Sequence, residues 1–205
     1  MKHYIILFYA YMIKHYRSLL MFNNNTVQFI FMPGFNKLRH FNAKARAYAQ
    51  FINAKNNVPA YRDFLKTKKF TKPSFTNFCP NISEIPIIDK ENYIKIYPLE
   101  NRCLNGAMPA KGLVIDESSG SSGAPTNWLR GHKERARNTR FIKFGMQKLF
   151  GKQPMFIINA FALGAWATGM NITMSCLTFA KVKSVGPELD KIENVTHIKG
   201  DFTDE

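Results

Sequence analysis

Apolar and polar positions follow a helical period over two long stretches of the chain. From Phe35 to Asn56, apolar side chains recur every three or four residues with cationic side chains elsewhere on the wheel, which predicts an amphipathic helix. Val58-Pro59 ends this helix, because the residue before proline is driven out of the helical region, and a short helical turn follows over Tyr61–Leu65. The same spacing predicts a helix over His132–Phe150 with a cationic outer face and core-facing phenylalanines, Phe141 among them.

Short apolar runs between the helical segments predict strands. Gly112–Ile115, Pro154–Phe161 and Lys181–Val185 are rich in apolar and β-branched residues, and Asn127–Gly131 is a strand-like return toward the first run. Helices are predicted over residues 162–179 and 188–197, and Asp89 is placed to cap a helix that begins at Lys90. Strands that alternate with helices predict an α/β fold with a mostly parallel sheet flanked by helices.

Composition and charge limit the class of protein. The 205 residues are 45% hydrophobic and include 18 Phe, so the chain can bury a core. Its three cysteines are widely spaced, which excludes a disulfide scaffold and favours a reducing, cytoplasmic compartment. The formal charge is +15, and it is concentrated before residue 153. A partner that carries phosphate or another anionic group is expected: a nucleic acid, an anionic lipid or a phosphorylated small molecule.

Residues 1–31 are interpreted as an aromatic N-terminal extension, and residues 32–205 as the functional domain. The apolar run Ile5–Ile13 resembles the centre of a signal peptide, but Lys14 and Arg17 stand where a small-residue cleavage site would be needed. Charged and polar residues also interrupt the run well before the roughly 20 residues of a membrane-spanning helix. Contact of residues 5–22 with a membrane surface is therefore the less favoured alternative.

The tract from Ser118 to Thr126, SSGSSGAPT, directly follows a predicted strand. Gly120 and Gly123 allow backbone torsions that let successive N–H groups converge on an anion, and the serine hydroxyls add donors. No Gly-Lys-Ser/Thr follows, so the tract is not a Walker-type loop. A flexible linker is the alternative, since Ser and Gly are common spacer residues, but the adjoining strand and Pro125 favour a phosphate cradle.

This tract resembles the Ser/Thr/Gly-rich phosphate-binding signature of adenylate-forming (AMP-binding) enzymes, in particular the phenylacetate-CoA ligase-like branch. Three further stretches agree: AYAQFINAKNNVPAYRDFL is similar to the opening helix of that branch, IPIIDKENY to its step before the core, and NAFALGAWATGMNI to the strand and helix after the loop. Most of the superfamily ends the signature with a lysine, where this chain has Thr126.

The resemblance implies an ATP-dependent ligase that converts a carboxylic acid to an acyl-adenylate with Mg-ATP and then passes the acyl group to a thiol, usually CoA. It implies an ATP phosphate site whose residues are Ser118, Ser119, Gly120, Ser121, Ser122, Gly123 and Thr126. The family's ribose-binding aspartate and C-terminal adenylation lysine have no counterpart here. We therefore expect residues 32–205 to be an incomplete N-terminal AMP-binding domain that is inactive alone, with its catalytic residues unassigned. A truncated gene, a decayed copy and a split subunit, whose missing region a complementary chain supplies, are the alternatives for its origin.

Other candidate sites are weaker. The basic helix over residues 132–150 could bind nucleic acid through interleaved phenylalanines, but its spacing favours a solvated cationic face. His132 is interpreted as a helix-start residue and Cys176 as core. Asp116-Glu117 is expected at a strand end facing water, with an approach to Mg²⁺ as the alternative. The five histidines are scattered, so no protein-held metal is predicted.

Overall fold

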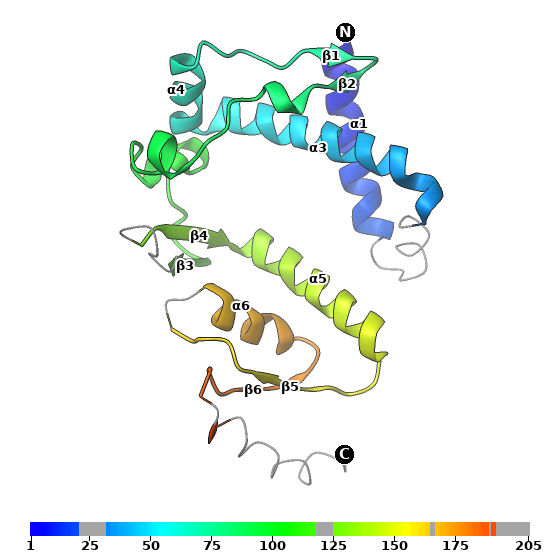
Figure 1. Ribbon diagram of the computed structural model, residues 1–205, viewed down its shortest axis with the longest axis vertical. Helices are drawn as coiled ribbons and strands as arrows, with labels where there is room; N and C mark the ends of the chain where they lie inside the picture. Colours follow the sequence, from blue (N-terminus) through cyan, green and yellow to red (C-terminus); the bar gives the residue numbers. More distant parts are fainter. Residues whose placement is uncertain (21–31, 118–124, 165–166, 189, 192–205) are drawn as a thin grey trace. The chain divides into compact units, whose positions relative to one another are not determined.

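The structure, a computed structural model, describes residues 1–20, 32–117, 125–164, 167–188 and 190–191 (Figure 1). These residues combine helices with short strands, so the mixed α/β class that the sequence predicts is confirmed. The chain divides into two compact units, Met1–Met108 and Pro109–Glu205, and each is described by itself.

The first unit is built mainly from helices. Its long elements are α1 (Lys2–Leu20), α3 (Asn36–Asn57) and α4 (Pro59–Thr67), and α3 lies where the apolar period predicts a helix. The short elements are η1 (Pro33–Phe35), β1 (Phe75–Thr76), β2 (Cys79–Pro80), η2 (Ile82–Glu84), η3 (Lys90–Ile94), η4 (Glu100–Arg102) and η5 (Leu104–Gly106).

One extended residue separates α3 from α4. Val58 has φ −112° and ψ 108°, its N–H donates to the Ala54 carbonyl, and its own carbonyl accepts from the Arg62 N–H. The proline therefore ends α3 as predicted, while the groups at the junction keep hydrogen-bond partners. Pro59 opens α4, since a proline suits the first helical position, and this makes α4 longer than the predicted turn over Tyr61–Leu65.

An aromatic cluster holds the first unit together. The ring of the fully buried Tyr48 lies 6.0 Å from Phe51 and 5.1 Å from Phe75, centroid to centroid. Phe64 of α4 packs edge to face on Tyr93 of η3 at 5.7 Å. Burial raises the pKa of Tyr93 to about 12, because the ionised phenolate would lose its hydration. Such pairs contribute about 0.5–1.5 kcal/mol each beyond their buried area.

Helix α1 packs across α3 in the same unit (Figure 1). Ile6 and Ala10 of α1 are buried in the aromatic cluster, and His3 Nδ1 lies 2.7 Å from the Tyr48 hydroxyl. Burial, followed by the charge of Lys72, lowers the pKa of His3. Residues 2–20 of the predicted extension thus form a helix with one buried face.

The predicted cap at Asp89 is confirmed. Its carboxylate accepts from the Asn92 N–H at 2.7 Å, and the Asn92 side chain accepts from the Asp89 N–H at 2.9 Å, which is a reciprocal capping box. The element that follows is a five-residue π-helical turn, shorter than the helix expected to run through Ile96.

The second unit alternates strands and helices in the predicted order. The elements are β3 (Leu113–Glu117), β4 (Asn127–Gly131), α5 (His132–Phe150), β5 (Phe156–Asn159), α6 (Ala167–Cys176) and β6 (Lys181–Ser184). α6 is shorter than the helix predicted over 162–179, because residues 161–164 form an irregular turn in which Gly164 has φ 92°. The helix predicted over 188–197 falls largely outside the described residues.

The predicted mostly parallel sheet is not confirmed. The described strands form three separate pairs: β1–β2 and β3–β4 are antiparallel, and only β5–β6 is parallel. Fewer than a dozen residues connect β3 to β4, which suits a hairpin, whereas a parallel pair needs a long crossover. The segment containing α6 supplies that crossover between β5 and β6.

Fewer apolar side chains are buried in the described part of the second unit than the apolar pattern predicts. Ile115, in the first apolar run, is 58% exposed, so the strand is present but its predicted apolar burial is wrong. Phe141 of α5 is 69% exposed, which contradicts its expected place in the core. The apolar positions of α5 follow the helical period, but the described elements packed on this helix do not reach all of them.

No helix in the described part of the chain is both long enough and apolar enough to cross a membrane.

Candidate functional site

The Ser-Gly tract lies between the two strands of a hairpin. β3 ends at Glu117 and β4 begins at Asn127, and these two residues are cross-strand partners. Of the predicted phosphate-binding residues, Thr126 is described and stands directly before β4, half-buried. The other six, Ser118, Ser119, Gly120, Ser121, Ser122 and Gly123, lie outside the described residues. The hairpin brings the two ends of the tract side by side.

A buried carboxylate fixes the base of this hairpin. The side chain of Asp116 is 3% exposed, and its Oδ2 accepts from Arg130 Nε on β4 at 2.5 Å and from Asn171 Nδ2 on α6 at 3.0 Å. Arg130 Nη1 also donates to Glu134 of α5 at 2.7 Å. The carboxylate therefore connects both strands of the hairpin to two helices, and the expectation that Asp116 faces water is wrong.

The hydrogen bonds of Asp116 to Arg130 and Asn171 argue against its binding a magnesium ion. Oδ2 accepts two hydrogen bonds, one of them from a guanidinium whose positive charge would oppose a nearby cation. No described group of three or more His, Cys, Asp or Glu side chains has the arrangement of a metal site. Asp116 thus acts as a structural anchor of the hairpin.

Arg135 of α5 contacts the chain just before β3. Its Nη2 donates to the Gly112 carbonyl at 3.1 Å, and its Nε is buried with no hydrogen-bond partner among the residues that the structure describes. Together with Arg130, this side chain places two guanidinium groups of the second unit at the hairpin. Arg130 is paired with Asp116 and Glu134, and Arg135 contacts the end of the hairpin opposite to the tract.

A second polar network closes the carboxyl ends of β5 and β6. The buried Asn159 donates from Nδ2 to the Gly169 carbonyl at 2.8 Å and to Thr173 Oγ1 at 2.7 Å, and its Oδ1 accepts from the Phe161 N–H at 3.1 Å. Thr173 Oγ1 lies 2.6 Å from Ser184 Oγ of β6. The Asn159 side chain therefore links β5 to α6, and Thr173 of α6 continues the link to Ser184 of β6.

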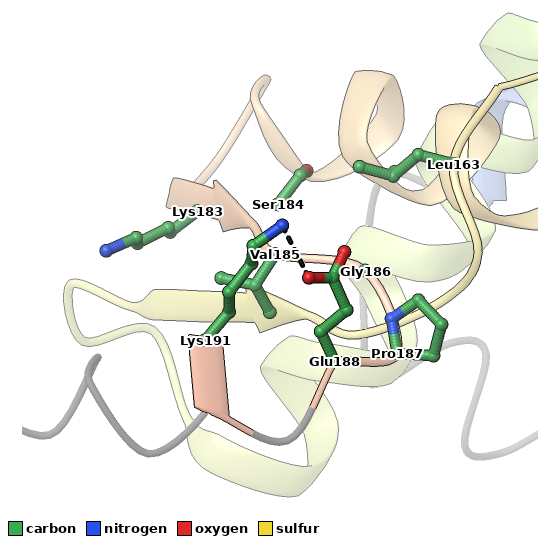
Figure 2. A pocket seen from close by; sticks show the side chains of 8 residues that line it. All are labelled: Leu163, Lys183, Ser184, Val185, Gly186, Pro187, Glu188 and Lys191. Atoms are coloured by element: carbon green, nitrogen blue, oxygen red, sulfur yellow. Dashed lines mark ion pairs between the residues drawn. The ribbon is translucent and has the colours of Figure 1, made fainter.

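A cavity of about 610 Å³ opens beyond the carboxyl ends of these two strands (Figure 2). Figure 2 shows the Lys191 and Glu188 side chains joined by an ion pair of 2.7 Å, whereas Lys183 points away from that pair. The hydrogen bond that Lys191 donates to the Glu188 carboxylate raises the pKa of Lys191. Ligands of open α/β sheets bind at this edge of parallel strands. The lining residues are Leu163, Lys183, Ser184, Val185, Gly186, Pro187, Glu188 and Lys191.

Asp116 and Asn159, which are not among the predicted phosphate-binding residues, hold together the hairpin and the β5–β6 pair. The sequence carries a signal for each of them. The alternation of β3 puts Asp116 on the same face as Val114, so a carboxylate on the inner face of an apolar strand could have been read as anchored. Asn159 ends an apolar strand, where a buried amide needs partners. Their partner Asn171 comes from a helix whose packing no local pattern predicts.

Two other predictions concern single side chains. His132 is the first residue of α5, as expected of a helix-start residue. Cys176 is 2% exposed, and burial raises the pKa of its thiol, so its prediction as a core residue is confirmed.

Comparison of the chain with protein-family models, with curated proteins and with solved structures finds no match.

Proposed function

We propose that the tract Ser118–Thr126 binds the phosphates of ATP in an adenylate-forming enzyme of the phenylacetate-CoA ligase-like type. The observation that carries this proposal is the hairpin: β3 and β4 pair up to both ends of the tract, and the buried Asp116–Arg130 ion pair fixes its base. A spacer would need no hydrogen-bonded strands at its two ends. A loop held this way can present its N–H groups in a fixed geometry toward an anion.

In this proposal, the chain positions the triphosphate and the nucleotide brings its own Mg²⁺. Backbone N–H groups and serine hydroxyls of the tract would donate to phosphate oxygens. The contacts of Asp116 assign it to Arg130 and Asn171, so no protein carboxylate is proposed as a magnesium ligand.

The carboxylic acid is proposed to enter the cavity beyond β5 and β6. The position supports this, because the cavity lies at the carboxyl edge of the parallel strands, and Leu163 and Val185 offer apolar contacts. CoA would accept the acyl group in the second step of the complete enzyme. We propose binding by this chain, with turnover supplied in an assembled enzyme, because no catalytic residue is assigned among its residues.

The finer fold is also a proposal. The β5–β6 pair would be the start of a mostly parallel sheet, since parallel pairs are stable mainly within larger sheets covered on both faces. Within the described residues neither strand has a second partner. A complementary chain that pairs with these edges would complete the N-terminal domain.

The test is a calorimetric titration of the full chain with Mg-ATP and with tripolyphosphate at low salt. We expect both ligands to bind, and we expect the double substitution Ser121→Ala/Ser122→Ala to weaken binding at least about tenfold, since even one charge-assisted hydrogen bond contributes about 1.5–3 kcal/mol. Ser83→Ala is the matched control, because Ser83 is an exposed serine of the first unit. Absence of binding, or equal losses in both variants, would contradict the proposal.

A second candidate function, nucleic-acid binding, is favoured by one observation. Phe141 is exposed on α5, and Lys133, Arg137 and Arg140 are exposed on the same helix. An accessible ring among cations can stack on an unpaired base. If this is the function, Phe141→Ala will weaken binding of a single-stranded oligonucleotide, and the affinity will fall steeply with salt. Ser121→Ala/Ser122→Ala would then leave the oligonucleotide affinity unchanged, which separates the two candidates.

A further inference from the structure

Helix α1 presents an apolar face that no described element covers. Ile6 and Ala10 face α3 and are buried, whereas Tyr4 is 73% and Phe8 67% exposed. The exposed side chains recur at spacings of three and four residues, so they form one continuous stripe on the opposite side of the helix. We call this stripe the outer face of α1, and it consists of Met1, Tyr4, Ile5, Phe8, Tyr11, Met12 and Tyr16.

Cationic side chains border the outer face of α1. At about 100° per residue, Lys2 and Lys14 lie about 120° to either side of Phe8 around the helix. The Lys2 ammonium lies 5.5 Å from the centroid of the Phe78 ring, so Lys14 is the bordering cation that can extend to the level of anionic headgroups while the rings enter the acyl boundary. Tyrosine suits that depth, because its ring is apolar and its hydroxyl is polar.

The surrounding sequence has a single sign of charge. Residues 1–62 contain nine Lys and Arg and no Asp or Glu, since Asp63 is the first acidic residue of the chain. In the same unit, Lys37, His40 and Lys44 line a groove of about 390 Å³ on α3 together with Phe41. The uniform charge of this part of the chain favours an anionic partner for the first unit.

We propose that the outer face of α1 lies flat in the interface of an anionic lipid bilayer, with Phe8 at the centre of the inserted stripe. An apolar stripe with basic borders is the pattern of helices that lie on membranes. Electrostatic attraction to acidic headgroups supports a lipid surface, and the same charge opposes a second copy of the chain, whose basic residues would repel those of the first. The inference concerns the first unit and stands independently of the phosphate-binding proposal for the second.

The experiment is cosedimentation of the full chain with vesicles of pure phosphatidylcholine and with vesicles containing about one third phosphatidylglycerol. We expect binding to the anionic vesicles that weakens at high salt, and little binding to the neutral ones. Phe8→Ser should weaken the anionic binding at least about tenfold, because a buried phenylalanine contributes on that scale. Lys14→Glu, which reverses one bordering charge, should also weaken it about tenfold.

The matched control is Phe141→Ser, which replaces a phenylalanine of almost the same exposure on α5 and should leave vesicle binding unchanged. Circular dichroism checks that each variant keeps the helical content of the parent chain. Equal losses for Phe8→Ser and Phe141→Ser would overturn the proposal. So would vesicle binding that Phe8→Ser leaves intact, or a lipid-free dimer that Phe8→Ser dissociates.

Discussion

Asp116 shows how one side chain can organise the second unit. Its carboxylate is almost inaccessible and contacts Arg130 from the neighbouring strand and Asn171 from α6. Loss of one partner of a buried ion pair leaves the other charge uncompensated, which costs more than the pair itself contributes. Arg130 is partly exposed and keeps Glu134, which reduces that cost.

We expect Asp116→Ala to lower the free energy of unfolding by about 2–3 kcal/mol. Urea denaturation followed by tryptophan fluorescence measures the change, because Trp128 lies on β4 of the same hairpin. The neighbouring carboxylate Glu117 provides the control: Glu117→Ala should change the free energy of unfolding by no more than about 0.5 kcal/mol. Equal effects of the two substitutions would show that Asp116 is not the anchor.

The sequence does not predict the contacts of buried polar residues such as Asp116. The local pattern of the sequence identifies β3, but the partners of Asp116 come from later in the chain, Arg130 from β4 and Asn171 from α6. Phe141 is the reverse case, an apolar side chain at a correct helical spacing whose partner element is not among the described ones. Phosphate binding by the tract Ser118–Thr126 stays a prediction, and the hairpin formed by its two flanking strands supports it.

At the scale of elements, the periodic patterns predict nearly every helix and strand of the second unit and the two adjoining helices of the first. Proline and capping signals are equally informative, because Val58-Pro59 and Asp89 act through nearest neighbours. Sheet topology is where prediction fails. The order of strands and helices predicts parallel pairing in general, whereas the short β3–β4 connection makes a hairpin.

Docking of α1 on α3 should depend on pH through His3. Burial lowers the pKa of His3 below its ordinary value of 6.5, so the folded state favours the neutral ring. The unfolded state then binds more protons near and below pH 6.5, and the stabilising contribution is present above that pH and lost as the pH falls through the folded pKa. We expect the amides of α1 to exchange faster at pH 5 than at pH 7, after correction for intrinsic rates.

The variant His3→Phe should remove this pH dependence, because its ring has no proton to gain. His15 is exposed on α1 and is the matched control, so His15→Phe should leave the dependence unchanged. Hydrogen exchange with mass spectrometry resolves α1 from the rest of the chain. An α1 equally protected at both pH values would contradict this role of His3.

At the scale of the whole molecule, the two units differ in how much apolar surface they bury. Among the described residues, nine hydrophobic residues are buried in the first unit, whereas in the second only Cys176 and Val185 are. Burial of apolar area is the main favourable term in folding. The second unit is therefore expected to be the less stable of the two.

This difference can be measured with the intrinsic fluorophores. Both tryptophans, Trp128 and Trp166, belong to the second unit, and the buried Tyr48 and Tyr93 and the partly buried Tyr61 belong to the first. In urea, we expect the tryptophan fluorescence to change at a lower concentration than the tyrosine near-UV circular dichroism. Saturating Mg-ATP should raise the tryptophan midpoint alone if the phosphate-binding proposal is correct. Coincident transitions would indicate one cooperative unit.

Gly169 on α6 constrains the turn that comes just before this helix. A β-carbon at this position would collide with the carbonyl of Ala162, because the turn after β5 lies directly against the helix backbone. The carbonyl of Gly169 is also engaged by Asn159. No other amino acid fits at position 169 while that turn keeps its path. Replacement of Gly169 therefore requires a different path for the turn. We expect the two changes to occur together in related sequences.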